Sequence, residues 1–169
     1  PSYNPNNFVL GISQSNWNAL LNDDRKPLLN KATSGAYPPG STFKMIVAAA
    51  ALELGLIGLN DKIFCSGFYE LGSRKFHCWL KGGHGKLALQ EAIQKSCDVY
   101  FYELARKVGI KKIGAMARIL GLGQSYNLPL TGLSKGFVPT KKWKKERFGT
   151  SWLVGDTLNV GIGQGFSLA

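Results

Sequence analysis

The sequence predicts an α+β fold that is mostly helical and contains few strands. Residues 43–55 and 89–120 carry apolar side chains at helical spacing, and residues 7–12 form a short apolar run typical of a strand. Residues 65–85 are rich in glycine and aromatic residues, which indicates hairpins or loops. With 169 residues, of which 44% are hydrophobic, the chain can bury a core, and we expect one domain.

The first part of the chain leads to one central helix. Residues 7–12 (NFVLGI) should form a strand, and the Asn- and Asp-rich residues 13–26 a loop with a short helix. The Pro38-Pro39-Gly40 sequence is incompatible with a helix, and Ser41 is a favourable N-cap for a helix over residues 43–55. Since alanine and aliphatic residues dominate this helix, we expect it to be buried nearly all round.

The second part predicts three helices followed by a loop-rich segment. Helical spacing over residues 89–95 is interrupted at Ser96-Cys97-Asp98, so Asp98 should be the N-cap of a second helix. Gly109 should end that helix, and a third should run to Gly121. The remainder, up to residue 169, lacks clear periodicity and is predicted to be mostly loop.

Charge and apolar content limit the possible partners. Lys and Arg outnumber Asp and Glu by 21 to 10, which gives a formal net charge of +11, so we expect an anionic partner or surface. No apolar run is long enough to cross a bilayer. The basic residues 141–147 (KKWKKER) are most simply a solvated face, and we expect no nucleic-acid partner; anionic lipid or acidic wall polymer would satisfy the charge equally well.

The sharpest chemical motif is Ser41-Thr42-Phe43-Lys44. A serine at a helix start and a lysine three residues later lie on one face, about one turn apart. A serine hydroxyl needs a base within hydrogen-bond reach, and a lysine acts as that base when burial favours its neutral form. The apolar helix after Lys44 supplies such burial. The alternative is a capping serine with a lysine that extends into solvent.

A second hydroxyl and a carboxylate, Ser96 and Asp98, lie in the predicted turn between two helices. They could approach the Ser41 motif in the folded chain. Taken alone, this pair is equally compatible with a helix cap.

These motifs, with three more, resemble those of the penicillin-binding protein 2 group of class B penicillin-binding proteins. In chain order they are Tyr37-Pro38-Pro39-Gly40-Ser41-Thr42-Phe43-Lys44, Gly83-His84-Gly85, Ser96-Cys97-Asp98-Val99-Tyr100-Phe101-Tyr102, Gly155-Asp156-Thr157 and Ile162-Gly163-Gln164-Gly165. The resemblance implies the penicilloyl serine transferase fold. It also implies a peptidoglycan D,D-transpeptidase that cross-links stem peptides during cell elongation and is acylated by β-lactams.

The resemblance assigns a role to each residue of the first constellation. Ser41 corresponds to the acylated nucleophile, Lys44 to its general base, and Ser96 to the hydroxyl that passes a proton to the leaving group. Asp98 stands where most of the superfamily has asparagine, and it would stabilise a charged Lys44 or orient the substrate amide. Because asparagine keeps an acceptor oxygen, we expect Asp98→Asn to be tolerated.

The third motif of the family, Lys-Thr-Gly, does not occur in residues 1–169. We therefore expect these residues to be a partial transpeptidase domain, poorly active by itself and cut from a longer protein. The resemblance implies a periplasmic location at the bacterial inner membrane, an anchor outside this chain and a membrane glycan polymerase as partner. The alternatives are a D,D-carboxypeptidase, a serine β-lactamase, or a non-catalytic β-lactam sensor or scaffold.

Three cysteines and one histidine form a second candidate site with the spacing Cys65-x12-Cys78-x5-His84-x12-Cys97. Spacing alone is weak, because structural zinc sites usually contain a closer cysteine pair, and buried or disulfide-paired cysteines are the alternative. A metal would hold the glycine-rich loop, which has little apolar periodicity. Some members of the group that the chain resembles bind zinc at these positions. We predict a structural zinc site, with His77 as the alternative histidine, and no organic cofactor.

Overall fold

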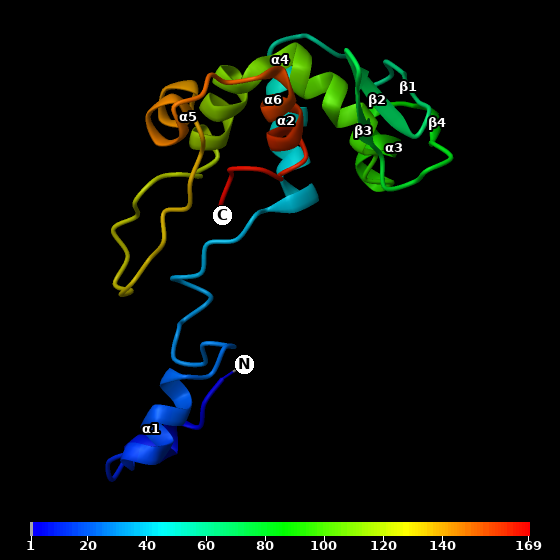
Figure 1. Ribbon diagram of the computed structural model, residues 1–169. Coiled ribbons are helices and arrows are strands. Elements are labelled where there is room, and N and C mark those ends of the chain that lie inside the picture. Colours follow the sequence, from blue (N-terminus) through cyan, green and yellow to red (C-terminus); the bar gives the residue numbers. More distant parts are fainter. Residues whose placement is uncertain (1) are drawn as a thin grey trace. The chain divides into compact units, whose positions relative to one another are not determined.

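The computed structural model describes residues 2–169, which form two compact units. One unit consists of residues 2–36 with Ser125–Ser134, and the other of Tyr37–Gln124 with Lys135–Ala169. The second unit carries every residue of the two candidate sites, and Figure 1 labels its helices and strands. Across residues 2–169, each helix falls short of the length or the apolar character that a membrane span requires.

The first unit contains a short 3₁₀ helix, η1 (Pro5–Phe8), and one α-helix, α1 (Gln14–Leu21). The helix predicted within residues 13–26 is therefore confirmed. The strand predicted over residues 7–12 is wrong. A strand needs a partner for its backbone and a surface for its apolar side chains, whereas Leu10 in this run is 98% exposed.

Three helices of the second unit build the core beside the candidate sites. Both α2 (Lys44–Glu53) and α6 (Val154–Gly161) pack against α4 (Asp98–Ile119) (Figure 1). Within α2, Val47 is fully buried but Met45 is 55% exposed. The prediction of a helix is confirmed, but one side of α2 faces outward, so burial nearly all round was wrong.

The long helix α4 is broken at Gly109, as predicted. Gly109 has φ 76° and ψ 152°, a conformation that glycine adopts without a steric penalty. Residues 98–108 and 110–119 are therefore two helical pieces, and the second piece corresponds to the third predicted helix.

The glycine- and aromatic-rich segment forms two small antiparallel sheets, which confirms the prediction of hairpin structure. The strands are β1 (Ile63–Cys65), β2 (Phe68–Leu71), β3 (Arg74–His77) and β4 (Gly85–Leu87). Strand β1 pairs with β4, and β2 pairs with β3. Cys65 lies opposite Gly85 in the first sheet, and the short helix α3 (Leu89–Gln94) follows β4. The pairing brings the chain just before Gly85 back to Cys65.

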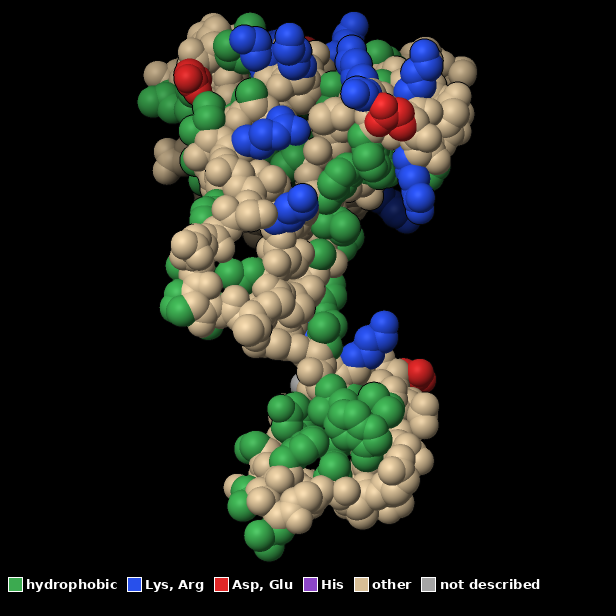
Figure 2. Space-filling model, turned by 90° about the vertical axis from the view of Figure 1, so that its left-hand side faces the viewer, with side chains coloured by type: hydrophobic (Ala, Val, Ile, Leu, Met, Phe, Trp, Pro, Cys, Tyr) green, Lys and Arg blue, Asp and Glu red, His purple; other side chains and the backbone are tan. Residues whose placement is uncertain are grey.

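The C-terminal part contains two helices where loops were predicted. Helix α5 (Lys141–Phe148) has Thr140 as its N-cap and ends at Gly149. Its residues are mostly charged, so it lacks the apolar stripe that marks a helix in a sequence. Lys144 is buried through an ion pair of 2.5 Å with Asp156 of α6. The basic residues 141–147 are therefore not an entirely solvated face, because Lys144 is buried. Figure 2 shows that Lys and Arg side chains outnumber acidic ones on one face of the molecule.

Candidate active site

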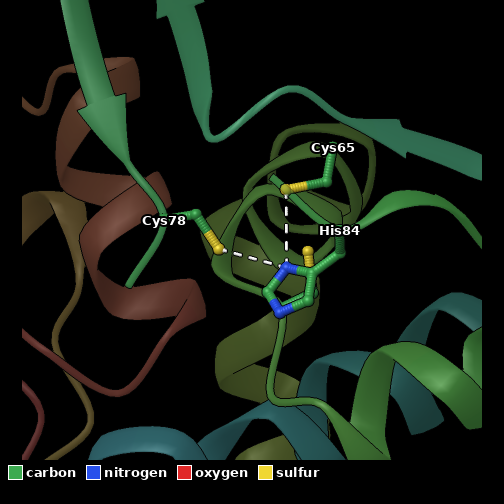
Figure 3. A group of neighbouring side chains, drawn as sticks. Cys65, Cys78 and His84 are labelled. Carbon is green, nitrogen blue, oxygen red and sulfur yellow. Dashed lines mark hydrogen bonds between the residues drawn. The ribbon is translucent and has the colours of Figure 1, made fainter. Parts of the chain in front are cut away.

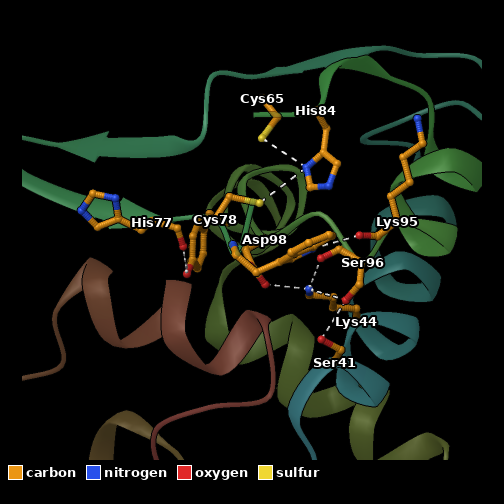
Figure 4. Close-up of polar contacts among 11 residues, drawn as sticks. Ser41, Lys44, Cys65, His77, Cys78, His84, Lys95, Ser96 and Asp98 are labelled. Carbon is orange, nitrogen blue, oxygen red and sulfur yellow. Dashed lines mark hydrogen bonds and ion pairs between the residues drawn. The ribbon is translucent and has the colours of Figure 1, made fainter. Parts of the chain in front are cut away.

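Ser41 and Lys44 lie together at the beginning of α2. Gly40, with φ 57°, turns the chain, and the 3₁₀ helix η2 (Gly40–Phe43) leads directly into α2. The prediction that Ser41 is the N-cap is therefore wrong, because Phe43 holds that position in α2. The Ser41 hydroxyl contacts Ser96 instead. The Ser41 side chain is accessible, whereas that of Lys44 is 3% exposed. Figure 4 shows the Ser41 and Lys44 side chains both directed toward Ser96.

Ser96 and Asp98 lie in the turn between α3 and α4. Ser96 has φ 51°, a left-handed conformation that costs a non-glycine residue roughly 1–3 kcal/mol and often marks a functional site. Cys97, with extended backbone angles, is the N-cap of α4, so Asp98 is the first helical residue and not the cap that was predicted. This turn directs the Ser96 hydroxyl and the Asp98 carboxylate toward α2 (Figure 4).

One continuous chain of hydrogen bonds joins these four residues. The Ser96 hydroxyl lies 2.9 Å from Ser41 Oγ, and Lys44 Nζ lies 3.0 Å from Ser96 Oγ. Lys44 Nζ also donates to the Ser96 carbonyl oxygen at 2.8 Å and to Asp98 Oδ1 at 2.7 Å. These contacts occupy all three N–H donors of an ammonium group. The path from Ser41 to Lys44 therefore runs through the Ser96 hydroxyl.

Lys44 and Asp98 form an ion pair that is largely removed from solvent, with side chains 3% and 14% exposed. Salt screens such a pair much less than a surface pair. The ring centroid of Phe101 lies 5.7 Å from Lys44 Nζ and adds a cation–π contact. A positive charge on Lys44 is thus stabilised beside two oxygen atoms of Ser96. In its neutral form Lys44 can accept a proton from Ser41 through Ser96, and these contacts then stabilise the ammonium that results.

Cys65, Cys78, His84 and Cys97 form a separate cluster, most of which is drawn in Figure 3. One ligand atom from each residue lies within 4.8 Å of the others. His84 Nδ1 is 3.6 Å from the Sγ atoms of both Cys65 and Cys78. In a tetrahedral zinc site with Zn–S of about 2.3 Å and Zn–N of about 2.0–2.1 Å, the sulfur–nitrogen edge is about 3.6 Å long. The two edges at His84 match a tetrahedral metal site, and the four residues together could hold a metal ion.

The chemical state of the cluster also suits a metal. All three cysteines are buried and free of disulfides. Burial raises the pKa of the Cys97 thiol, and the nearby Cys65 and Cys78 raise it further; burial also lowers the pKa of His84. His84 Nε2 is buried without a hydrogen-bond partner. A cation would stabilise thiolates here, and neutral histidine is the ligating form. His77, the alternative ligand, is exposed and lies outside the cluster.

Trp79 connects this cluster to the Ser96 turn, a role that no sequence pattern indicated. Its backbone N–H donates to Asp98 Oδ2 at 2.9 Å, and its indole N–H donates to the Lys95 carbonyl oxygen at 3.1 Å. Its ring stands edge-on to His84, with centroids 5.3 Å apart. The only signal in the sequence is that Trp79 directly follows Cys78.

A contact between two glycines supports the turn before Ser41. The Gly40 N–H donates to the Gly163 carbonyl oxygen at 2.9 Å. Gly163 has φ 73°, and a Cβ atom at this position would lie 1.9 Å from the Gly40 carbonyl oxygen. Only glycine permits so close an approach. Gly163 of the Ile162-Gly163-Gln164-Gly165 motif therefore helps to place the turn that carries Ser41.

The fold and the Ser41 site together match one known family. The model of the penicillin-binding protein transpeptidase domain matches residues 1–169. The chain belongs to this family, which confirms the predicted transpeptidase-like α+β fold.

Individual relatives confirm the resemblance to penicillin-binding protein 2. The chain is 44% identical over 168 residues to the peptidoglycan D,D-transpeptidase MrdA of Escherichia coli K12, covering 98% of this chain and 26% of that protein. Penicillin-binding protein 2 of Helicobacter pylori, in complex with MreC, is 44% identical with a TM-score of 0.94, over 100% of this chain and 32% of that one. Penicillin-binding protein 2 of Pseudomonas aeruginosa, in complex with WCK 5153, is 40% identical with a TM-score of 0.92. The match covers 100% of this chain and 39% of that chain. The chain spans about a quarter of the length of the curated relatives that it matches.

Proposed function

We propose that this chain carries the nucleophile and the proton-transfer residues of a serine-type peptidoglycan D,D-transpeptidase. The observation that carries the proposal is the hydrogen-bond chain from Ser41 through Ser96 to Lys44. The names of the relatives, peptidoglycan D,D-transpeptidases, support the same reaction. Ser41 would attack the carbonyl between the two terminal D-alanines of a stem peptide, and an amine of a neighbouring stem peptide would take the acyl group.

Proton transfer in this proposal follows the observed contacts. With Lys44 in its neutral form, the Ser41 proton passes through the Ser96 hydroxyl to Lys44 Nζ while Ser41 Oγ bonds to the carbonyl carbon. The new ammonium is stabilised by Asp98 Oδ1 at 2.7 Å. When the C–N bond breaks, Ser96 delivers the proton to the departing amine of D-alanine. The same path takes a proton from the incoming amine in the second half of the reaction.

The test is covalent labelling of the protein containing residues 1–169 by a fluorescent penicillin, with mapping of the modified peptide. We expect the label on Ser41 and none in Ser41→Ala. Ser73, an exposed serine between β2 and β3, provides the control variant Ser73→Ala, which should label normally. Label that persists in Ser41→Ala refutes the proposal. Transfer of the acyl group to an added amine, and not to water, separates a transpeptidase from a carboxypeptidase or a β-lactamase.

We propose that Cys65, Cys78, His84 and Cys97 hold a structural zinc ion. The sulfur–nitrogen distances of 3.6 Å and the buried, unpaired thiols support this ligand set. Four such ligands fill a tetrahedral coordination sphere, so zinc here would rigidify the loop and leave no position for substrate. Elemental analysis should find about one zinc per chain. Less than about a tenth of an equivalent contradicts the proposal.

We further propose that residues 1–169 are part of one transpeptidase domain that works at the periplasmic face of the inner membrane with a membrane glycan polymerase. Two solved relatives that are described as complexes support the existence of a partner. One is the H. pylori complex of penicillin-binding protein 2 with MreC. The other, described as a peptidoglycan synthase complex that coordinates polymerization and crosslinking, is 35% identical with a TM-score of 0.87 and covers 100% of this chain and 29% of its own. Crosslinking in intact cells, followed by identification of the captured membrane protein, tests the partner.

A further inference from the structure

We propose that Trp79 is a positioning residue that clamps the Ser96 turn from both sides, in a protein that is acylated as proposed above. The backbone N–H of Trp79 binds Asp98 Oδ2, and its indole N–H binds the carbonyl oxygen of Lys95. Lys95 precedes Ser96, and Asp98 follows it by two residues. One residue therefore bridges the two ends of the turn that carries the relay hydroxyl.

The geometry of tryptophan makes this bridge stiff. The two N–H groups belong to one residue, and only two side-chain torsions separate the indole from the backbone. The hydrogen bonds of 2.9 Å and 3.1 Å therefore fix the distance between the Asp98 carboxylate and the Lys95 carbonyl oxygen. A turn held at both ends cannot open without breaking at least one of them.

The Ser96 turn needs outside support for two reasons. Ser96 has φ 51°, a conformation that persists only when the surroundings impose it. Its hydroxyl must also stay within reach of both Ser41, at 2.9 Å, and Lys44, at 3.0 Å. Misplacing a catalytic group by 1 Å can cost about a hundred-fold in rate. The clamp adds to the backbone hydrogen bonds from the Ser96 N–H to Ile93 and from the Cys97 N–H to Ala92.

The clamp is anchored in the loop that carries the Cys/His cluster. Cys78, the residue before Trp79, is buried, and its backbone N–H donates to the Gly67 carbonyl oxygen at 2.8 Å. The Trp79 ring also rests edge-on against His84. The side chain of Trp79 is nevertheless 62% exposed, so it is not a core residue. Loss of the indole N–H should therefore loosen the turn without unfolding the protein.

A second role for the exposed ring would be direct contact with substrate. Trp79 lines an open groove together with Leu80, His84, Lys95 and Ser96. The two roles have different kinetic consequences. A ligand contact mainly changes the dissociation constant of the initial penicillin complex, whereas the clamp changes the rate constant of acylation within that complex. We assign Trp79 to the clamp and not to substrate contact.

The experiment compares two tryptophan variants in the protein that contains this chain. Trp79→Phe removes the indole donor, and replacement of Trp79 by benzothienylalanine removes only the N–H while keeping the double ring. Trp152→Phe is the matched control, because the Trp152 indole donates to the Thr157 hydroxyl at 2.8 Å away from the Ser96 turn. Rapid-mixing kinetics with a fluorescent penicillin then give the dissociation constant and the acylation rate constant separately.

We expect both Trp79 replacements to lower the acylation rate constant about ten-fold, which corresponds to about 1.4 kcal/mol. The dissociation constant should change less than about two-fold, and Trp152→Phe should behave like the parent. An unchanged acylation rate constant, or a change in the dissociation constant alone, overturns the clamp while leaving acylation at Ser41 intact.

A measurement that does not depend on activity completes the test. Hydrogen exchange of the Trp79 indole N–H, followed by NMR, should be clearly slower than that of an exposed indole, and removal of bound zinc should speed it up. Exchange as fast as in free indole overturns the proposal. If the parent protein is not acylated at all, the proposed function fails, and a protected indole N–H then shows a contact without a role in acylation.

Discussion

Replacing Asp98 by asparagine is the most informative test of the buried ion pair. Asp98 accepts from Lys44 Nζ through Oδ1 and from the Trp79 N–H through Oδ2. Asparagine has one acceptor oxygen, and its NH₂ group would face the second donor. The sequence alone led us to expect tolerance, because asparagine keeps an acceptor. Because Lys44 and Trp79 donate to different oxygen atoms of Asp98, we now expect Asp98→Asn to be destabilising.

The expected loss of stability follows from burial. Leaving a buried donor unpaired costs about 1–3 kcal/mol, and breaking a buried ion pair by removing one partner costs about 3–5 kcal/mol. Lys44 keeps two acceptors on Ser96, and Asp98 is 14% exposed, so the full cost of the ion pair is not reached. We expect Asp98→Asn to lower the free energy of unfolding by about 2–4 kcal/mol. Penicillin labelling should also slow, because the ammonium formed on Lys44 loses its counter-ion.

The assay combines urea unfolding with labelling at a temperature where every variant is folded. Asp156→Asn is the matched control, because Asp156 pairs with Lys144 at 2.5 Å, with side chains 17% and 9% exposed, and also accepts from the Leu153 N–H. Both donors bind Asp156 Oδ2, so an asparagine oxygen can still accept from both; Asp156→Asn should lose less stability than Asp98→Asn and label at nearly the parental rate. An Asp98→Asn protein with parental stability and a parental labelling rate refutes the reasoning.

Three further outcomes are expected. Cys78→Ser should bind less zinc than the parent and unfold at a lower temperature, as measured by elemental analysis and calorimetry; parental values in both would exclude the ligand set. Zinc retention in dialysis should rise with pH, because protons compete with the metal for the Cys97 thiolate and burial raises the pKa of that thiol; retention independent of pH contradicts this. Gly163→Ala should slow penicillin labelling more than Gly165→Ala does, because both positions have positive φ but only a Cβ at Gly163 would collide with the Gly40 carbonyl oxygen; equal rates would show that the collision is relieved elsewhere.

The sequence predicted the features that local interactions determine. The helices around Lys44 and on either side of Gly109 follow from apolar spacing and from one glycine with positive φ. The candidate residues Ser41 and Ser96 were recognised because they belong to short motifs. Such patterns carry their information within a few neighbouring positions.

The remaining features depend on contacts between distant parts of the chain. Helix α5 was missed because Lys144 is buried by Asp156 and not by an apolar stripe. The Ser96 hydroxyl between Ser41 and Lys44, and the two hydrogen bonds of Trp79, are tertiary contacts that no local pattern encodes. The strand predicted over residues 7–12 failed for the same reason, because a strand depends on a partner supplied from elsewhere.

The contact between Gly40 and Gly163 also sets an order of events during protein synthesis. A ribosome adds roughly 5–20 residues per second, so Gly163 follows Ser41 only after an interval on the order of ten seconds. During that time the turn that presents Ser41 lacks the backbone on which it rests in the finished fold. The growing chain therefore carries an incompletely supported Ser41 turn until the segment around Gly163 has been made and packs against Gly40.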